Sequence, residues 1–214
     1  MEKTKSLYIL STHRLIVINK MKTAEKIMAM LLREGRKTAT EIAERLRMSR
    51  QAAWKTLKSL IQQRLVLATA LNSKQTSAQL FTLNFRNPVA EKALSLSLTR
   101  QAVEHERWLD LFSGIEGHAE FFLLFGSILK NPKKANDIDV IAVAEKKEFA
   151  IIQEKIQQIQ LAQAKRIHAA LTTKTEFSQE IKEENKAYLE AISKGVVLFG
   201  QEKFINAMRE LNER

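Results

Sequence analysis

The sequence predicts an α+β protein built from two units that carry different chemistry. Three helical patterns and two strand-like segments follow one another within residues 1–86. An apolar run of strand length, a Gly-Ser pair and two closely spaced acids follow later, within residues 114–214. The excess positive charge is confined to the first of these parts. We therefore expect a first unit at residues 1–86, a connecting helix at residues 87–113 and a second unit at residues 114–214.

Composition excludes several classes of protein. The 214 residues include no Cys, which excludes disulfides, zinc-thiolate and iron–sulfur sites and a cysteine nucleophile. The longest apolar runs, such as Leu15–Ile18 and Phe121–Phe125, are far shorter than the ~18–20 residues that span a bilayer. The first residues show no secretion signal. We expect a cytoplasmic protein with no membrane partner.

The charge is distributed unevenly along the chain. Residues 1–86 hold 17 Lys or Arg and 5 Asp or Glu, a net charge of +12. Residues 87–214 hold 18 and 19, a net charge of −1. So basic a segment attracts polyanions, of which nucleic acid is the first to consider. The alternative is a solvated basic face without a specific partner.

Helix signals organise residues 23–63. Thr23 is the expected N-cap of a first helix that ends at Gly35, and Thr40 is expected to open a second. Ser49 is the expected N-cap of a third helix, Arg50–Gln63. Its expected inward positions are Ala53, Leu57, Leu60 and Ile61. Two strands at residues 65–67 and 80–83 follow, joined by a polar tip at residues 72–77, whereas residues 1–20 fit either strands or a helix.

This order of elements resembles the winged helix-turn-helix family over residues 23–84. The resemblance is carried by the segments Thr40–Leu46, Met48–Gln51, Leu57–Leu60 and Leu65-Val66. It implies a regulator of transcription that binds double-stranded DNA with its third helix in the major groove. The residues expected to contact DNA are Ser49, Arg50 and Gln51 at base edges, Lys55 and Lys58 near phosphates, and Lys74 on the wing. The alternative is that the same fold serves protein–protein contact.

A long helix is expected from Pro88 to about Phe112. Its apolar residues suggest one buried stripe formed by Val89, Ala93, Leu96, Val103, Leu109 and Phe112. Two interpretations stay open: the stripe pairs two copies of the chain as a homodimer, or it packs against the second unit. Dimerisation would match the two-fold symmetry that is common in DNA operators.

The second unit holds a candidate phosphate and metal site. Asp137 and Asp139 precede a β-branched run, and residues i and i+2 of a strand point to the same side. Two carboxylates held so close repel each other unless a cation neutralises them, and Mg²⁺ prefers oxygen ligands. Gly126 permits a tight turn, after which backbone N–H groups and the Ser127 hydroxyl can meet a phosphate.

Phe125-Gly126-Ser127, the ten-residue gap and Asn136–Val140 resemble the nucleotidyltransferase superfamily, the fold of DNA polymerase beta. The resemblance covers residues 110–205, including the later segment Gly195–Gly200. It implies a mixed sheet with flanking helices, a nucleoside triphosphate held by Gly126 and Ser127, and Mg²⁺ held by Asp137 and Asp139 as catalytic acids.

The chain departs from that family's pattern at the third acid. The strand expected to carry it, Arg166–Leu171, contains no Asp or Glu, and His168 stands in its place. Imidazole is a poor ligand for Mg²⁺ and suits Zn²⁺ or Mn²⁺ better. Asn136 replaces the usual small residue before the first acid, and Glu145 or Glu176 would have to supply the missing carboxylate. Whether the chain is an enzyme is therefore left open.

The leading interpretation is a DNA-binding transcriptional regulator whose second unit binds or senses a metal–nucleotide. One alternative is an active Mg²⁺-dependent nucleotidyltransferase that modifies a protein, an RNA or a small molecule. Another is an antitoxin-like protein whose second unit binds a different chain. In the plainest alternative, Asp137 and Asp139 are exposed residues of a fold that has lost its chemistry.

Overall fold

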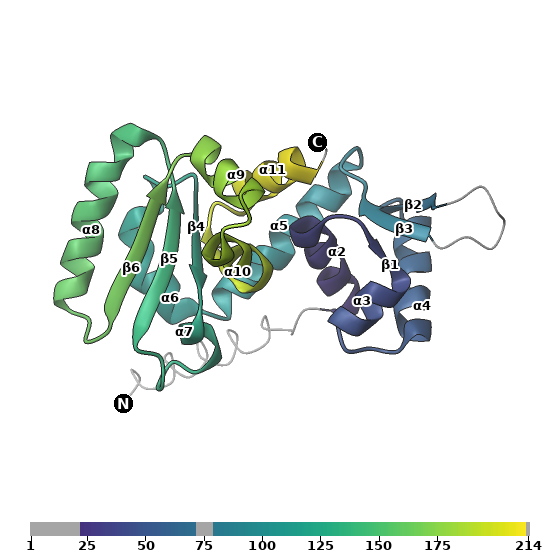
Figure 1. Cartoon of the computed structure of the whole chain (residues 1–214), viewed down its shortest axis with the longest axis horizontal. Coiled ribbons are helices and arrows are strands. Elements are labelled where there is room, and N and C mark those ends of the chain that lie inside the picture. Colours follow the sequence, from purple (N-terminus) through teal and green to yellow (C-terminus); the bar gives the residue numbers. More distant parts are fainter. Residues whose placement is uncertain (1–21, 72–78, 213–214) are drawn as a thin grey trace, which may run out of the picture.

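The computed structural model describes residues 22–71 and 79–212. The predictions for residues 1–20, for the tip at residues 72–77 and for Lys74 lie outside these ranges. Two units lie along the long axis of the molecule, one around a small sheet and one around a larger sheet (Figure 1). In the described ranges, no helix combines the length and the apolar character needed to cross a membrane.

The first unit is a winged helix-turn-helix domain, as expected. Its elements are α2 (Thr23–Glu34), β1 (Lys37–Thr38), α3 (Ala39–Arg45), α4 (Arg50–Gln62), β2 (Val66–Ala70) and β3 (Gln79–Leu83). The three strands form an antiparallel sheet in the order β1-β3-β2. Helix α4 buries Ala53, Leu57 and Leu60 as predicted, whereas Ile61 is only half-buried.

The helix caps correct two of the predicted starts. Helix α2 has Lys22, not Thr23, as its N-cap. Helix α3 begins two residues earlier than predicted, because Thr38 and not Thr40 is its N-cap. The Glu41 N–H donates to the Thr38 hydroxyl at 3.3 Å, and the Glu41 carboxylate accepts from the Thr38 N–H at 2.7 Å. This is the capping box that a Thr followed three residues later by Glu favours.

The predicted connecting helix is two helices, α5 (Pro88–Val103) and α6 (Glu106–Phe112). The predicted stripe is wrong for three residues of α5, since Val89, Leu96 and Val103 are 60%, 53% and 42% exposed, whereas Ala93 is half-buried against the core. The buried face consists of Ala90, Leu94, Leu98 and Ala102. These residues recur every four positions, whereas the exposed three recur every seven on the opposite side of the helix. In α6, Phe112 is buried as expected.

The second unit is a mixed sheet between helices. Its elements are η1 (Ser113–Ile115), β4 (Phe121–Phe125), α7 (Ser127–Lys130), β5 (Asp137–Val143), η2 (Lys146–Glu148), α8 (Phe149–Leu161), β6 (Arg166–Thr172), α9 (Lys174–Lys182), α10 (Lys186–Lys194), β7 (Val196–Phe199) and α11 (Gln201–Asn212). The strand order is β6-β5-β4-β7. Strand β4 is antiparallel to β5 and β7, whereas β5 and β6 are parallel. The sheet is thus mixed, as the sequence predicted.

Alternate residues of β4 face two different cores. Phe121, Leu123 and Phe125 belong to a cluster with residues of α9, α10 and α11. Phe122 and Leu124 belong to a second cluster with residues of α6, η1, α7 and α8. Because helices cover both faces, every residue of β4 is buried. Asp137 and Asp139 share the parity of Ile141, so they lie on the face of α9, α10 and α11.

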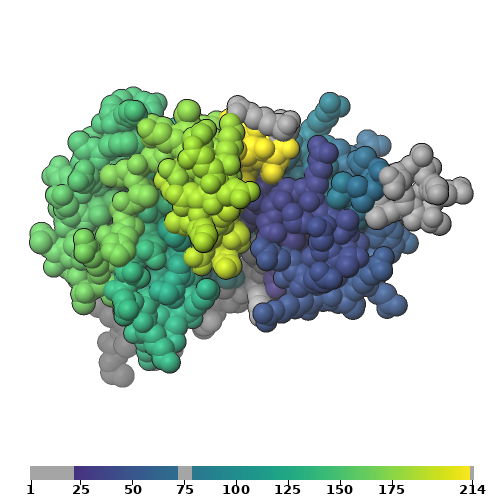
Figure 2. All heavy atoms as spheres, viewed as in Figure 1, coloured from purple at the N-terminus to yellow at the C-terminus, as the bar shows by residue number. Residues whose placement is uncertain are grey.

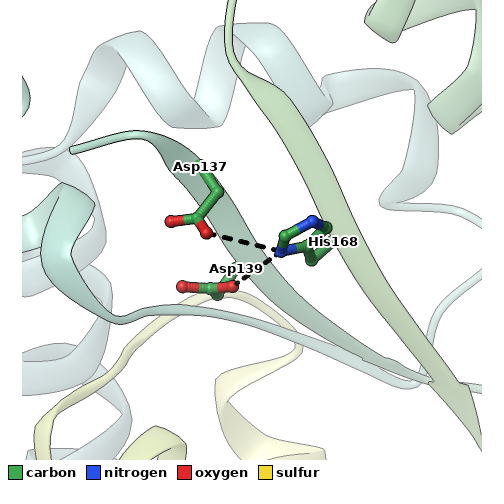
Figure 3. Close-up of side chains that lie close together, drawn as sticks. All are labelled: Asp137, Asp139 and His168. Atoms are coloured by element: carbon green, nitrogen blue, oxygen red, sulfur yellow. Dashed lines mark ion pairs between the residues drawn. The ribbon is translucent and has the colours of Figure 1, made fainter.

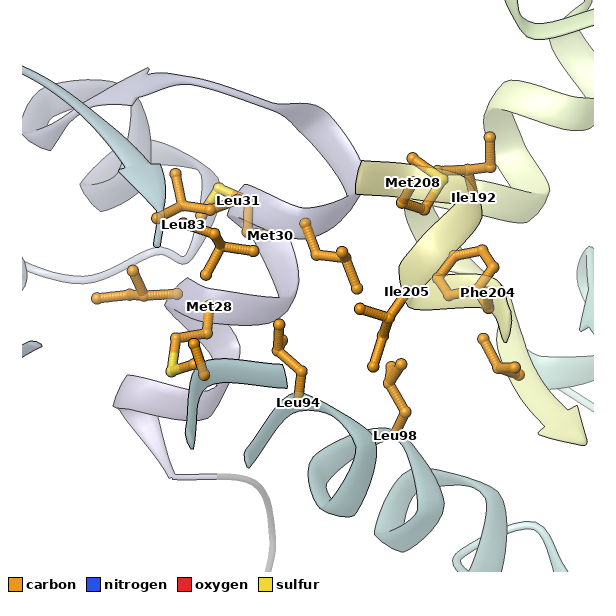
Figure 4. Packing of buried hydrophobic residues seen from close by; sticks show 14 of the residues in the cluster. Met28, Met30, Leu31, Leu83, Leu94, Leu98, Ile192, Phe204, Ile205 and Met208 are labelled. Atoms are coloured by element: carbon orange, nitrogen blue, oxygen red, sulfur yellow. The ribbon is translucent and has the colours of Figure 1, made fainter. Parts of the chain in front are cut away.

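The first cluster continues into the winged helix-turn-helix domain without a break. Leu94 and Leu98 of α5 lie between side chains of α2 and those of α11 (Figure 4). The Arg33 guanidinium of α2 adds polar contacts, because it donates to the backbone oxygens of Ile192 and Gly195, each at 2.8 Å. The two units therefore share one hydrophobic core, and the hydrogen bonds of Arg33 also join them.

Candidate nucleic-acid interface and candidate metal centre

Helix α4 presents a polar and basic face to solvent. The residues expected at DNA lie on it or at its N-cap, and all are exposed: Ser49, Arg50, Gln51, Lys55 and Lys58. The Ser49 hydroxyl accepts from the Ala52 N–H at 3.1 Å, which fixes the start of the helix and confirms the predicted cap. The opposite face of α4 is anchored by its buried apolar residues.

The surroundings of α4 are strongly basic. Between Glu44 and Glu91 the chain contains eight Lys or Arg and no Asp or Glu. Two of these, Arg47 before α4 and Arg64 after it, are exposed and adopt positive φ angles of 52° and 56°. Sequence reasoning did not select these two for the interface, although both lie in the segments that flank α4.

No described residue of the second unit covers this surface. Helix α4 lies at the end of the molecule opposite the four-stranded sheet (Figure 1). In the space-filling view, the blue atoms of this region form one end, away from the green atoms of the sheet (Figure 2). A nucleic acid would therefore reach α4 without a rearrangement of the two units.

Trp54 is packed at the border of this face. Its ring lies 5.7 Å from that of Phe81 in an edge-on arrangement, and it remains 36% exposed. The Lys58 ammonium lies 5.7 Å from the centre of the Trp54 ring. The indole thus holds Lys58 against the surface by a cation–π contact.

The acids of the second unit form a cluster with a histidine. Asp137 and Asp139 start β5, and the parallel register places His168 of β6 beside Asp139. His168 Nδ1 lies 3.5 Å from Asp137 Oδ2 and 3.5 Å from Asp139 Oδ1 (Figure 3). One ligand atom from each residue lies within 4.8 Å of the others. The structure thus brings together both predicted acids and His168, which lies on the strand where a third acid was expected.

The electrostatics of the cluster disfavour the ionised form of Asp139. Burial raises the pKa of the Asp139 carboxyl, and the neighbouring Asp137 charge raises it further. His168 acts in the opposite direction, whereas Glu190 of α10 adds a smaller repulsion. Glu190 was missed by sequence reasoning, because only folding brings α10 to this face of the sheet.

Gly126 and Ser127 occupy different positions relative to the acids. Gly126 has φ +83°, and a Cβ built on it would lie 2.4 Å from Asp139 Oδ2. The Asp139 carboxylate therefore rests against a backbone that only Gly leaves open. Ser127 is exposed and begins α7, a helix of four residues.

Neither proposed substitute acid reaches the cluster. Glu145 pairs with Lys147 at 2.7 Å, and Glu176 caps α9 through the Thr173 N–H at 2.8 Å. A cavity of about 500 Å³ lies beside the cluster and is lined by residues that include Asp139, Arg166, His168 and Ala187. The site therefore has room for a ligand, with a histidine in place of the third acid.

Comparison with known proteins bears on the first unit. Residues 22–71 match the family described as the RNA polymerase III subunit RPC82 helix-turn-helix domain, which is less than half of the chain. No curated protein matches the chain.

The chain is similar to solved structures of two bacterial proteins. For the adhesin competence repressor AdcR from Streptococcus pyogenes the identity is 20%, over 75% of this chain and 96% of that chain, with a TM-score of 0.34. For Lactococcus lactis ZitR in complex with DNA the identity is 21%, over 68% and 77%, with a TM-score of 0.31. Such low TM-scores carry no argument about function. The matched family and the order of elements together identify residues 23–83 as a winged helix-turn-helix domain.

Proposed function

We propose that this protein is a transcriptional regulator that binds double-stranded DNA through α4. The observation that carries the proposal is the exposed face of α4, set in a segment with eight cations and no anion between Glu44 and Glu91. A helix fits the major groove, where each base pair displays a distinct pattern of donors and acceptors. Basic residues around it supply the phosphate contacts that give most of the affinity.

The residues of this face have different expected roles. Arg50 and Gln51 lie in the first turn of α4, where Arg pairs with guanine and Gln with adenine, each through two hydrogen bonds. Ser49 precedes them at the N-cap. Lys55 and Lys58 lie one and two turns further on and would contact phosphates, as would Lys74 on the wing.

The test is binding to a duplex selected from a random-sequence pool. Arg50→Ala should weaken binding to the selected duplex by ~1–3 kcal/mol, which is about 5- to 150-fold, and relax the preference at one base pair. Arg107→Ala is the matched control, because Arg107 is exposed on α6 in the other half of the molecule. The affinity should also fall steeply with salt, by ~0.9 in log K per neutralised phosphate for each unit of log salt. Salt-independent binding, or no loss with Arg50→Ala, would overturn the proposal.

For the second unit we propose binding of a divalent cation, alone or as a metal–nucleotide, at Asp137 and Asp139. The raised pKa of Asp139 supports this, since a cation would relieve the repulsion between the two carboxylates. The cavity beside Asp139 offers room for a ligand, and Phe125 is among the residues that line it. Gly126 and Ser127 follow Phe125 directly and would meet the phosphates of a nucleoside triphosphate. Mg²⁺ is the cation that the nucleotidyltransferase resemblance implies.

Helix α10 offers a route by which such binding would affect DNA affinity. Near its start, Ala187 lines the cavity beside Asp139. At its end, the backbone oxygens of Ile192 and Gly195 accept from Arg33 of α2. A ligand that shifts α10 would thus shift the contact with the DNA-binding domain, provided that it binds the two arrangements with different affinity.

Nucleotidyl transfer is the second candidate function. It is favoured by the placement of the Gly126 backbone against the Asp139 carboxylate, beside the Asp137 carboxylate. It is opposed by His168 beside the two acids, because imidazole is a poor ligand for the Mg²⁺ that the transfer would use. Incubation with labelled nucleotides and Mg²⁺ or Mn²⁺ tests it. Label incorporation by the wild type that is lost in Asp139→Asn would establish the enzyme, and its absence would leave binding alone.

We also propose that the exposed stripe of α5 pairs two copies of the chain. Val89, Leu96 and Val103 recur every seven residues on a face that no other described element covers. A dimer would present two copies of α4 to a symmetric DNA site. Leu96→Glu should convert a dimer into a monomer in sedimentation experiments, with Leu161→Glu, at a site 90% exposed, as the control. A monomeric wild type that co-purifies with a different chain would favour the antitoxin-like alternative instead.

A further inference from the structure

We infer that His168 is the third protein ligand of the cluster, and that the site takes Zn²⁺ in preference to Mg²⁺. The inference rests on the proposed binding of a cation at Asp137 and Asp139 and names its chemical class. It differs from the expected magnesium site, in which the two carboxylates, waters and phosphate oxygens would hold the ion.

The spacing of the ligand atoms supports this geometry. In a tetrahedral zinc site with bonds of about 2.0–2.2 Å, neighbouring ligand atoms are about 3.4 Å apart. His168 Nδ1 lies 3.5 Å from an oxygen of each acid, and all three ligand atoms lie within 4.8 Å of one another. Adjacent ligands of octahedral Mg²⁺ are closer, at about 2.9 Å. Small side-chain rotations would therefore complete a zinc site, whereas a magnesium site needs a tighter cluster.

The chemistry of the donors points the same way. A neutral imidazole suits Zn²⁺ and neighbouring transition metals, whereas Mg²⁺ favours oxygen and sheds its water reluctantly. For equal ligands, Zn²⁺ also binds more tightly than Mn²⁺. In a set of two carboxylates and one imidazole, His168 is thus the ligand that most favours Zn²⁺ over Mg²⁺.

The scaffold holds the three ligands in place without the metal. Asp137, Asp139 and His168 come from two adjacent strands whose pairing is continuous from Asp137↔Arg166 to Val143↔Thr172. Ligands on paired strands are positioned more accurately than ligands on loops. The two acids flank Ile138, which is fully buried and anchors the start of β5. Little ordering would therefore be needed when a metal binds.

The cluster also leaves a coordination position open. The side chains of Asp137, Asp139 and His168 are 34%, 26% and 49% exposed. The second ring nitrogen of His168 is turned away from both carboxylates (Figure 3). Three protein ligands and an open fourth position are typical of zinc sites that also hold a water or a small ligand.

The metal-free alternative is an ion pair in which a protonated His168 bridges the two carboxylates. It predicts the same distances but no affinity for metal, so direct binding decides between them. We would titrate the metal-free full-length chain with Zn²⁺, Mn²⁺ and Mg²⁺ against a chromophoric chelator. The expected order of affinity is Zn²⁺, then Mn²⁺, then Mg²⁺.

His168→Ala is the decisive variant. It should weaken Zn²⁺ binding at least about tenfold and leave Mg²⁺ binding unchanged, because ligand loss acts only on the metal that uses the imidazole. Cobalt substitution gives a second readout, since a tetrahedral Co²⁺ site absorbs visible light and the band should vanish in His168→Ala. His118→Ala is the control, because His118 pairs with Glu148 at 2.8 Å outside the cluster. Circular dichroism would verify that each variant is folded.

The possible results distinguish the zinc assignment from the proposal that Asp137 and Asp139 bind a cation. Equal affinity for Mg²⁺ and Zn²⁺, or Zn²⁺ affinity retained in His168→Ala, would overturn the zinc assignment. If Asp139→Asn then abolished binding of either metal, cation binding by the acids would still stand. No binding of any of the three metals would overturn both statements about the second unit, while DNA binding by α4 would be tested separately.

Discussion

The exposed face of α4 and the acid cluster are built in opposite ways. The surface of α4 comes from neighbouring residues of one helix, from Ser49 to Lys58, and its core contacts are made on the other side of that helix. The acid cluster instead joins Asp137 and Asp139 to His168, which is about 30 residues further along the chain, through the register of two strands. One is a local arrangement and the other depends on long-range pairing.

This difference determines how each region should respond to change. A local surface survives remote substitutions as long as its helix is folded. A cluster made by strand register fails when one backbone segment moves by a few tenths of an ångström.

Removal of the Arg33 side chain should affect both regions at once. Arg33→Ala would leave the oxygens of Ile192 and Gly195 without their donor, which costs ~2–4 kcal/mol of unfolding free energy. Desolvation lowers the pKa of Arg33 to about 10, so its charge is still present at neutral pH. Denaturant unfolding measures the loss, and the two units should begin to unfold in separate transitions. The control is Arg36→Ala, because Arg36 is exposed. An equal loss of unfolding free energy in that variant would contradict the role of the Arg33 hydrogen bonds.

Gly126→Ala should disturb the acid cluster and leave the exposed face of α4 unchanged. The new Cβ would lie 2.4 Å from Asp139 Oδ2, at a φ of +83° that Ala adopts only with strain. We expect a loss of ~1–3 kcal/mol in stability and of most metal affinity, with DNA affinity in the absence of metal unchanged. Gly117→Ala is the matched control, because a Cβ there meets nothing within 4 Å. Unchanged metal binding in Gly126→Ala would refute the close fit.

Thr38→Ala should destabilise the first unit more than Thr40→Ala does. Thr38 caps α3 through the Glu41 N–H at 3.3 Å, so its loss should cost ~1 kcal/mol. Thr40 lies exposed inside α3, and its substitution should change the unfolding free energy by less than ~0.5 kcal/mol. Thermal unfolding of the two variants compares them directly. The reverse order would mean that the helix starts where the sequence pattern first suggested.

Asp139→Asn should stabilise the metal-free chain slightly. The raised pKa of Asp139 means that its ionisation costs more in the folded chain than in the unfolded chain. That penalty is present above the folded pKa and fades as the pH falls through it, so the gain in Tm should be seen at neutral pH and vanish in acid. The gain in the free energy of unfolding should stay below about 1 kcal/mol, because water screens the part-exposed carboxylate.

Exposed Asp110→Asn on α6 serves as the control for this effect. Added metal should reverse the order of stability, since only the wild type keeps both carboxylates for the cation. A wild type that is more stable than Asp139→Asn without metal at neutral pH would contradict the repulsion between the acids.

Elements whose residues are neighbours along the chain could be predicted from sequence patterns. The Ser49 cap, the buried residues Ala53, Leu57 and Leu60 of α4, and the shared face of Asp137 and Asp139 follow from helical and strand periodicity. Such patterns depend only on backbone geometry, which is the same in every fold. The Thr38–Glu41 capping box was equally local, and it was missed only because Thr40 was taken as the start.

The tertiary structure alone decided which of two apolar faces of α5 is buried. Two sets of apolar residues recur at helical spacing along α5. The chain buries one set against α2 and α11, namely Ala90, Leu94, Leu98 and Ala102, and leaves the other exposed, namely Val89, Leu96 and Val103. Folding also brings His168 beside the two acids and places Glu190 where its charge raises the pKa of Asp139. It likewise lets Arg33 of α2 donate a hydrogen bond to the end of α10. Periodicity shows that a face is apolar, but its partner is chosen by packing between segments that are distant in the sequence.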